Sequence, residues 1–311
     1  MNILFTSSGR RVELIKIAKE VVERFGGSIF CVDSSPSAPT SQFCNVFEKV
    51  PQISSAEYIP TLLDFCKRHK IDILIPLLDT ELIPIAENVN SFKKLGVLVN
   101  ISSVDVVKIC HDKMLTQKFF CENSILNPSV KEDINVDNVK YPLFIKPIDG
   151  SSSVMSYKVN NARELEFFKT YVQKPIIQQF IEGDEYTIDV CCDFNSKPIT
   201  VVPRQRISVR AGEIQKGKTV KDAEIINKAK DIVAKLKPYG HITIQCIKNK
   251  DGVFFTEINP RFGGGAPMSI SAGANSIENL VRLKLGEELE YSENWQENML
   301  FSRFDDAVVI K

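Results

Sequence analysis

The first hundred residues alternate between short apolar runs and segments with helical periodicity, and this alternation restricts the fold more than any other feature. Apolar runs bounded by polar turns predict buried strands, whereas apolar residues spaced by three or four predict helices. The expected strands are 3–5, 28–32, 71–77 and 97–100, and the expected helices are 10–24, 58–69 and 81–90. Strands that alternate with helices form right-handed βαβ units. We therefore predict an α/β protein that begins with a Rossmann-like parallel-sheet domain.

One edge of this sheet is a candidate ligand site, because ligands gather at the carboxyl ends of parallel strands. The edge is expected to carry the turn 7–11 (Ser-Ser-Gly-Arg-Arg), Asp33 and residues 79–81 (Asp-Thr-Glu). The turn lacks the G-x-G-x-x-G fingerprint, so it does not predict a dinucleotide site. The same residues are equally suited to capping helices, and the crevice stays a hypothesis.

Composition limits the class of protein and its partners. The 311 residues are enough for two or three domains, and 39 basic side chains balance 39 acidic ones. The overall charge is not basic, so the composition does not indicate a nucleic-acid partner. Eight cysteines without a C-x-x-C pair are typical of a reduced, cytoplasmic protein. No apolar run approaches the roughly 20 residues of a membrane span, and the first residues do not resemble a signal peptide.

A strand near the C-terminal end predicts a metal site. The run 253–255 is apolar, and Glu257 and Asn259, two residues apart, share one face of the strand that continues it. Mg²⁺ binds one or two such oxygen ligands together with substrate phosphates. Arg261 adds an anion-binding fork, and the glycines 263–265 allow close approach of the backbone. The alternative is a solvent-facing strand that ends in a glycine-rich turn.

Two lysines and a small-residue loop predict phosphate binding in the middle of the chain. Lys113 opens a helix after Asp112, where a cation opposes the helix dipole unless an anion is present. Lys146 ends the apolar strand 141–147. The loop that follows contains Gly150, Ser151, Ser152 and Ser153. Its N–H groups can form an anion-binding nest. A surface lysine and a plain hairpin loop are the alternatives.

In this order, the motifs resemble the ATP-grasp superfamily, in the branch of the large subunit of carbamoyl phosphate synthetase. The motifs are Asp112-Lys113, Phe144-Ile145-Lys146-Pro147, the Gly-Ser loop, the run 178–187 (QQFIEGDEYT) and Glu257-Ile258-Asn259-Pro260-Arg261. The resemblance spans nearly the whole chain. It implies a Rossmann-like domain over 1–103 and an ATP-grasp module of two α+β subdomains that clasp ATP. These would be a lid subdomain with the phosphate loop over 104–181 and a C-terminal subdomain with the metal site over 182–311.

The resemblance also implies the residues that bind ATP. Lys113 and Lys146 would contact the phosphates, and the loop 150–153 would close over them. Adenine would lie at a hinge formed by Gln178, Gln179, Phe180 and Ile181. Many family members carry Glu at the position of Gln178, but an amide oxygen can still accept a hydrogen bond from the adenine amino group. Glu185 would bind the ribose hydroxyls.

The metal and its ligands follow from the same resemblance. Glu257 and Asn259 would hold Mg²⁺, with Mn²⁺ as an alternative. Gln245 lies across a predicted hairpin from Glu257 and matches a third ligand in carbamoyl phosphate synthetase. This position is often acidic elsewhere in the superfamily, so the number of metal ions stays open.

Arginines are the candidate catalytic residues. Arg204 and Arg206 share one face of the expected strand 199–209, and burial of two arginines requires an anion. The resemblance implies that one or both of them bind the substrate carboxylate or the transferred phosphoryl group, and Arg261 is the third candidate. A solvated strand face is the alternative for Arg204 and Arg206.

These roles predict an ADP-forming, ATP-dependent carboxylate-amine ligase that forms an amide or peptide bond through an acyl phosphate. Its partners would be a small-molecule carboxylate and an amine, and family members are often homodimers. The chain has room for one module only, which argues against complete carbamoyl phosphate synthesis. Two alternatives stay open: an enzyme that releases a small acyl or carbamoyl phosphate, and a nucleotide-binding module without turnover.

Overall fold

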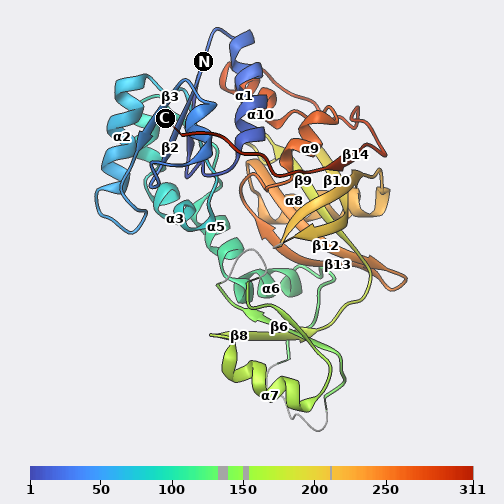
Figure 1. The fold of residues 1–311 in the computed structure, drawn as a ribbon. Coiled ribbons are helices and arrows are strands. Elements are labelled where there is room, and N and C mark those ends of the chain that lie inside the picture. Colours follow the sequence, from blue (N-terminus) through green and yellow to red (C-terminus); the bar gives the residue numbers. More distant parts are fainter. Residues whose placement is uncertain (132–138, 150–153, 211, 311) are drawn as a thin grey trace.

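The computed structural model describes residues 1–131, 139–149, 154–210 and 212–310. It contains three sheets (Figure 1): a five-stranded parallel sheet ordered β3-β2-β1-β4-β5, a three-stranded sheet ordered β7-β6-β8 and a six-stranded sheet ordered β13-β12-β9-β10-β11-β14. The two later sheets are antiparallel in every pairing. The predicted fold class, a parallel N-terminal sheet followed by an α+β module, is confirmed.

The parallel sheet and its helices follow the predicted alternation closely. Its elements are β1 (Asn2–Thr6), α1 (Val12–Arg24), β2 (Ser28–Asp33), η1 (Pro39–Gln42), β3 (Val46–Lys49), α2 (Tyr58–His69), β4 (Ile73–Pro76), α3 (Asp79–Glu87), α4 (Val89–Lys94) and β5 (Leu98–Val99). Ile3 and Phe5 belong to the core that contains α1, whereas Leu4 belongs to the core that contains α2. Both faces of the sheet are therefore covered, as parallel sheets require.

One face of the parallel sheet is covered partly by the C-terminal part of the chain. Two helices, α9 (Ala266–Ser271) and α10 (Ser276–Lys284), lie beside α1 (Figure 1). Phe262 and Leu280 are fully buried in the same core as Ile3. The segment that follows Arg261 is therefore fixed against the N-terminal domain.

The remaining elements form the two antiparallel sheets and the helices around them. They are α5 (Val104–His111), α6 (Lys113–Glu122), β6 (Leu143–Pro147), β7 (Tyr157–Val159), α7 (Ala162–Tyr171), β8 (Pro175–Gln179), β9 (Asp184–Cys192), β10 (Pro198–Arg210), β11 (Glu213–Thr219), α8 (Ala223–Leu236), β12 (Gly240–Asn249), β13 (Gly252–Asn259) and β14 (Leu300–Ser302). Side chains of α5, α6 and α8 share the core of the six-stranded sheet. No helix among the described residues is long and apolar enough to cross a membrane.

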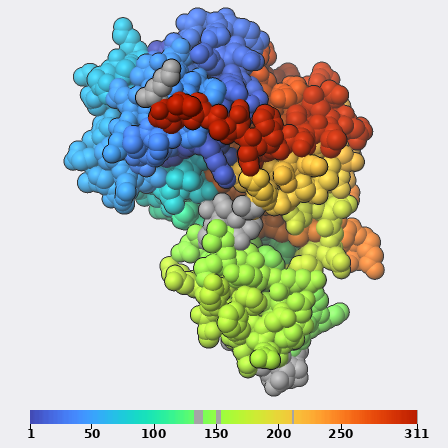
Figure 2. Space-filling model, viewed as in Figure 1, coloured from blue at the N-terminus to red at the C-terminus, as the bar shows by residue number. Residues whose placement is uncertain are grey.

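The connection between β8 and β9 passes from one sheet to the other. β9 begins only a few residues after β8 ends. However, β8 belongs to the three-stranded sheet and β9 to the six-stranded sheet. Gly183 lies in this connection, and a Cβ atom there would lie 2.4 Å from the carbonyl oxygen of Lys248. Only glycine allows this approach. After β14, the C-terminal residues lie across the N-terminal domain (Figure 2).

We predict that the core shared by the two ends of the chain contributes strongly to stability. Leu280→Ala removes a fully buried side chain and should lower the free energy of unfolding by about 2–5 kcal/mol. Leu285, whose side chain is 55% exposed at the end of the same helix, offers a matched control. Leu285→Ala should change the free energy of unfolding by less than about 0.5 kcal/mol. Urea denaturation measures both, and equal losses would contradict the shared core.

Candidate active site

The predicted metal ligands lie together on neighbouring strands. In the β12–β13 pair, Gln245 lies directly opposite Glu257, and Thr243 lies opposite Asn259. Side chains that face each other across an antiparallel pair share one side of the sheet. The set provides one carboxylate and two amide oxygens. Because the described residues contain no group of three His, Cys, Asp or Glu side chains that could hold a metal ion, an ion here would need oxygen atoms from a ligand.

The side of the sheet that carries Gln245, Glu257 and Asn259 is called the metal face here. Two lysines approach it from other elements. The Nζ atom of Lys113 donates to the carbonyl oxygen of Ile148 at 3.1 Å, at the end of β6. Lys146 of β6 is 9% exposed. Burial lowers the pKa of Lys146 to about 8, and the charge of Lys113 adds to this effect, whereas Glu257 opposes it. The structure therefore brings Lys113, Lys146 and Glu257 together, as predicted for a phosphate site.

Gln178 is buried at the base of the predicted adenine pocket. Its Nε2 atom donates to the Oε1 atom of Gln117 at 3.1 Å and to the carbonyl oxygen of Pro128 at 3.5 Å. The amide nitrogen is therefore held by protein acceptors. The amide oxygen of Gln178 is therefore the atom that can accept a hydrogen bond from a ligand.

The backbone after Gln178 is the segment predicted to bind adenine at a hinge. The N–H of Gln179 donates to the carbonyl oxygen of Ser129 at 2.9 Å, so this N–H is already bonded within the protein. The ring of Phe180 lies 4.4 Å from the Nζ atom of Lys158. The N–H of Ile181 has no backbone partner among the described residues. The carbonyl group of Gln179 and the N–H of Ile181 can therefore pair with a donor and an acceptor on one edge of a base.

Glu185 and Arg206 form the side of the site next to this hinge. The Nε atom of Arg206 lies 3.2 Å from a carboxylate oxygen of Glu185, whose side chain is 55% exposed. Arg206 also donates to the hydroxyl of Thr187 at 3.3 Å and to the carbonyl oxygen of Gly212 at 3.0 Å. Burial lowers the pKa of Arg206, while Glu185 and Glu257 raise it. Arg206 therefore lies between the predicted ribose and metal positions.

Arg204 points into the protein interior. Its side chain is 1% exposed and donates to both carboxylate oxygens of Asp189, at 2.8 and 3.0 Å. Burial alone would raise the pKa of Asp189, but the charge of Arg204 and the nearby His241 ring lower it below its usual range. The sequence predicts that Arg204 pairs with an anionic group of the substrate, whereas in the structure it pairs with the buried carboxylate of Asp189. This difference corrects the expected role of Arg204, because its charge is already neutralised.

The network around Asp189 supports the segment that carries Arg261. The Thr243 hydroxyl lies 3.3 Å from Asp189 and 3.1 Å from the carbonyl oxygen of Arg261, and it accepts from the N–H of Gly263 at 3.2 Å. A Cβ atom on Gly265 would lie 2.3 Å from a nitrogen of Arg204. The buried pair therefore positions the backbone of the glycine segment.

Arg261 connects this segment to the edge of the parallel sheet. Its Nε and Nη2 atoms donate to the two carboxylate oxygens of Asp79 at 2.7 and 2.6 Å. Glu81, which follows, is fully buried and accepts from Ser7 at 2.9 Å. Of the predicted crevice residues, Asp79 thus reaches the site, whereas Glu81 holds the turn at Ser7.

Some predicted residues lie outside the described part of the chain, and some residues of the site were not predicted. The predicted loop residues Gly150, Ser151, Ser152 and Ser153 lie outside the described residues. Asp189 was not predicted, although a carboxylate inside the apolar run 188–192 signals a buried partner. Arg11 was predicted only as part of the crevice turn 7–11, without a role of its own.

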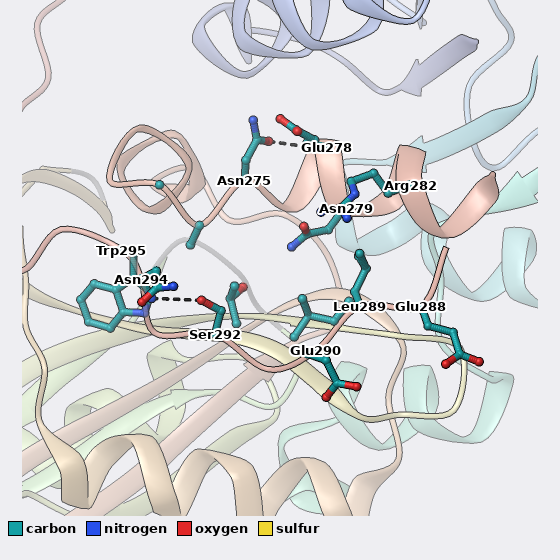
Figure 3. A pocket seen from close by; sticks show the side chains of 14 residues that line it. Asn275, Glu278, Asn279, Arg282, Glu288, Leu289, Glu290, Ser292, Asn294 and Trp295 are labelled. Carbon is teal, nitrogen blue, oxygen red and sulfur yellow. Dashed lines mark hydrogen bonds between the residues drawn. The ribbon is translucent and has the colours of Figure 1, made fainter. Parts of the chain in front are cut away.

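A separate pocket lies away from these residues. It has a volume of about 320 Å³ and is lined by residues of α10, the start of β10 and the segment 288–295 (Figure 3). Asn275 accepts a hydrogen bond from the N–H of Glu278 at its rim. None of the predicted site residues lines this pocket.

Comparison with known proteins supports this description of the chain. A family model described as "PylC-like, N-terminal domain" matches residues 3–100, and a model described as "ATP-grasp domain" matches residues 110–265, half of the chain. A D-alanine–D-alanine ligase of Pelagibacter ubique is 30% identical over 119 residues, which are 34% of this chain and 39% of that protein. The chain thus spans about two fifths of the length of that relative.

Solved structures show the same fold at low sequence identity. A biotin carboxylase from Campylobacter jejuni, in a βγ-ATP complex, has a TM-score of 0.76 at 14% identity, over 96% of this chain and 74% of that chain. An L-amino acid ligase from Bacillus licheniformis has a TM-score of 0.71 at 17% identity, over 91% of this chain and 74% of that chain.

We predict that Asp189 and Arg204 depend on each other for stability. Asp189→Leu leaves the Arg204 charge buried and unpaired, which should lower the free energy of unfolding by about 3–5 kcal/mol. In the double variant Asp189→Leu/Arg204→Met, both charges are absent, and most of the loss should be recovered. Chemical denaturation of the full chain measures both variants. A double variant as unstable as the single one would show that the pair is not the cause.

Proposed function

The chain belongs to the ATP-grasp family, and we propose that it is an ADP-forming ligase that joins a carboxylate to an amine. One observation carries this proposal: Lys113, Lys146 and Glu257 come from three distant elements and meet beside the amides of Gln245 and Asn259. Phosphoryl transfer depends mainly on positioning and charge neutralisation, and these groups supply both. The names of the ligases that this chain resembles support the same reaction class.

The proposed reaction has two steps. A carboxylate oxygen attacks the γ-phosphorus of ATP, the bond from that phosphorus to the β–γ bridging oxygen breaks, and ADP leaves. The amine nitrogen then attacks the acyl carbon, inorganic phosphate leaves with the carboxylate oxygen, and the amine loses a proton to solvent. The products are an amide, ADP and phosphate.

Each side chain has a proposed role in this reaction. Lys113 and Lys146 bind ATP phosphates, and Arg206 and Arg261 stabilise charge on the transferred phosphoryl group. The unpredicted pairing of Arg261 with Asp79 orients its guanidinium. Gln178, Gln179, Phe180 and Ile181 form the adenine pocket, and Glu185 binds ribose.

Mg²⁺ fits the donor set of the metal face. Glu257, Asn259 and Gln245 offer hard oxygen atoms but a single negative charge, and Mg²⁺ is commonly bound by few protein ligands together with substrate phosphates. The ion would neutralise phosphate charge when bound with ATP. Mn²⁺ prefers the same type of ligand.

We predict that Glu257→Gln and Lys146→Ala each lower kcat for ADP formation at least about 100-fold, because the first removes the carboxylate that would hold Mg²⁺ and the second removes a positive charge at the phosphates. The exposed residues Glu166 and Lys169 of α7 provide matched controls, Glu166→Gln and Lys169→Ala, which should retain turnover. The assay measures ADP release with a panel of carboxylates and amines. Near-normal turnover by Glu257→Gln or Lys146→Ala would refute the site assignment.

The same assay separates the proposed ligase from its alternatives. ADP release that requires both an acid and an amine, with a new amide, supports the ligase. ADP release with an acid alone would indicate an enzyme that releases an acyl phosphate. Tight MgATP binding without turnover on any pair would indicate a nucleotide-binding module.

We also predict that MgATP affinity falls as the pH rises above 8. The pKa of Lys146 in the protein is about 8, so its positive charge is present below this pH and is lost above it. The Kd for MgATP should therefore increase by up to about tenfold per pH unit between pH 8 and 9.5. Lys146→Arg keeps its charge in this range and should give a flatter profile. Isothermal titration calorimetry measures both; identical profiles would exclude Lys146 as the titrating group.

A further inference from the structure

The Arg11 side chain lacks an assigned partner although it lies beside the proposed active site. Arg11 occupies the turn between β1 and α1, and its side chain is partly buried. Its Nη1 atom is buried and has no hydrogen-bond partner in the described part of the chain. A buried guanidinium nitrogen without an acceptor is unfavourable, which suggests that an acceptor is supplied from outside the chain.

The carboxylates near Arg11 are already bound by other arginines. Both oxygens of Asp79 accept from Arg261, at 2.7 and 2.6 Å. Glu213 accepts from Arg303 at 2.8 Å. Arg11 makes no ion pair with any carboxylate of the described residues. Arg10 also lies 3.4 Å from Glu213, so the guanidinium groups here outnumber the two carboxylates. Burial and the charge of Arg261 lower the pKa of Arg11 to about 10.

The backbone of the glycine segment approaches Arg11 closely. A Cβ atom on Gly264 would lie 2.6 Å from the Nη1 atom of Arg11 and 3.1 Å from a carboxylate oxygen of Glu213. Any larger residue would displace the guanidinium. The charges of Arg261 and Asp79 also act on Arg11, so Arg11 lies beside the Arg261–Asp79 pair of the proposed site.

The neighbouring Arg10 does not share this environment. Its side chain is 73% exposed, and its nearest carboxylate is Glu213 at 3.4 Å. Arg10 is thus solvated, whereas Arg11 is turned toward the interior between the two domains. The position of Arg11 in the turn after β1 also places it at the carboxyl edge of the parallel sheet, where ligands gather.

We propose that Arg11 binds an anionic group of a substrate, distinct from the carboxylate that is phosphorylated. The proposal rests on the proposed function and narrows its substrate class: either the amine substrate carries a carboxylate, as an α-amino acid does, or the acid substrate carries a second carboxylate, as a dicarboxylate does. A guanidinium matches a carboxylate with two parallel hydrogen bonds. A phosphate monoester offers the same oxygen acceptors, and the experiment distinguishes the two sources.

The test compares substrates in matched pairs, using the full chain and saturating MgATP. Each amino acid or dicarboxylate is assayed beside the analogue in which one carboxylate is a carboxamide, and phosphoethanolamine is included as an amine with a phosphate group. We expect wild-type kcat/KM to favour the acid over its carboxamide at least 100-fold. Arg11→Gln should reduce this preference at least tenfold through the KM for that substrate, with the KM for ATP unchanged. Arg11→Lys should retain part of the preference.

Arg24→Gln serves as the control, because Arg24 lies at the other end of α1 and pairs with Glu278 at the surface. It should keep the wild-type preference. An Arg11-dependent preference for phosphoethanolamine would assign the anionic group to phosphate. Wild-type protein that uses acids and carboxamides equally, or Arg11→Gln protein with an unchanged preference, would overturn the proposal.

Absence of turnover with every pair would count against the ligase, and Arg11 would then be tested by binding. The melting temperature of the MgADP-bound protein is measured with the same acids and carboxamides. Stabilisation by acids that is lost in Arg11→Gln and kept in Arg24→Gln supports the anion site. Equal shifts for acids and carboxamides in the wild type overturn it.

Discussion

The geometry of the candidate site depends on one buried carboxylate, Asp189. Its two oxygens lie within hydrogen-bonding distance of Arg204, Ser269 and Thr243. A carboxylate away from water is stable only with such a full set of donors. These donors come from β10, α9 and β12, so the charge ties together three elements that surround the glycine segment. The position of Arg261, and through it the contact with the N-terminal domain, follows from this arrangement.

Much of the fold was predictable because local pattern and final structure agree. The helices 58–69 and 223–236 have an apolar face in the sequence and begin and end as their periodicity indicates. Short edge elements were harder: β3 and β14 carry few buried side chains. Their strand structure comes from pairing with neighbours, which no local pattern contains.

The candidate site was predictable to the extent that its chemistry lies in strand ends and helix starts. Period-two spacing on β13 indicated that Glu257 and Asn259 share a face, and the register of β12 against β13 places Gln245 beside them. What spacing could not show was the partner of each charge. Arg204 and Arg206 have the same pattern in sequence, but one is neutralised inside the protein by Asp189 and the other lies beside Glu185. The distinction between Arg10 and Arg11 likewise depends on tertiary packing.

The core shared by α1, α9 and α10 has a consequence for the synthesis of the chain. The strands of the parallel sheet are complete by residue 99, but Phe262 and Leu280, which cover one of its faces, come more than 160 residues later. At about 5–20 residues per second, a ribosome needs on the order of ten seconds or more for that stretch. During this interval one face of the nascent sheet is covered only by α1, so chaperones can bind to its exposed part until the last helices emerge. A chain truncated before residue 262 would keep that surface permanently.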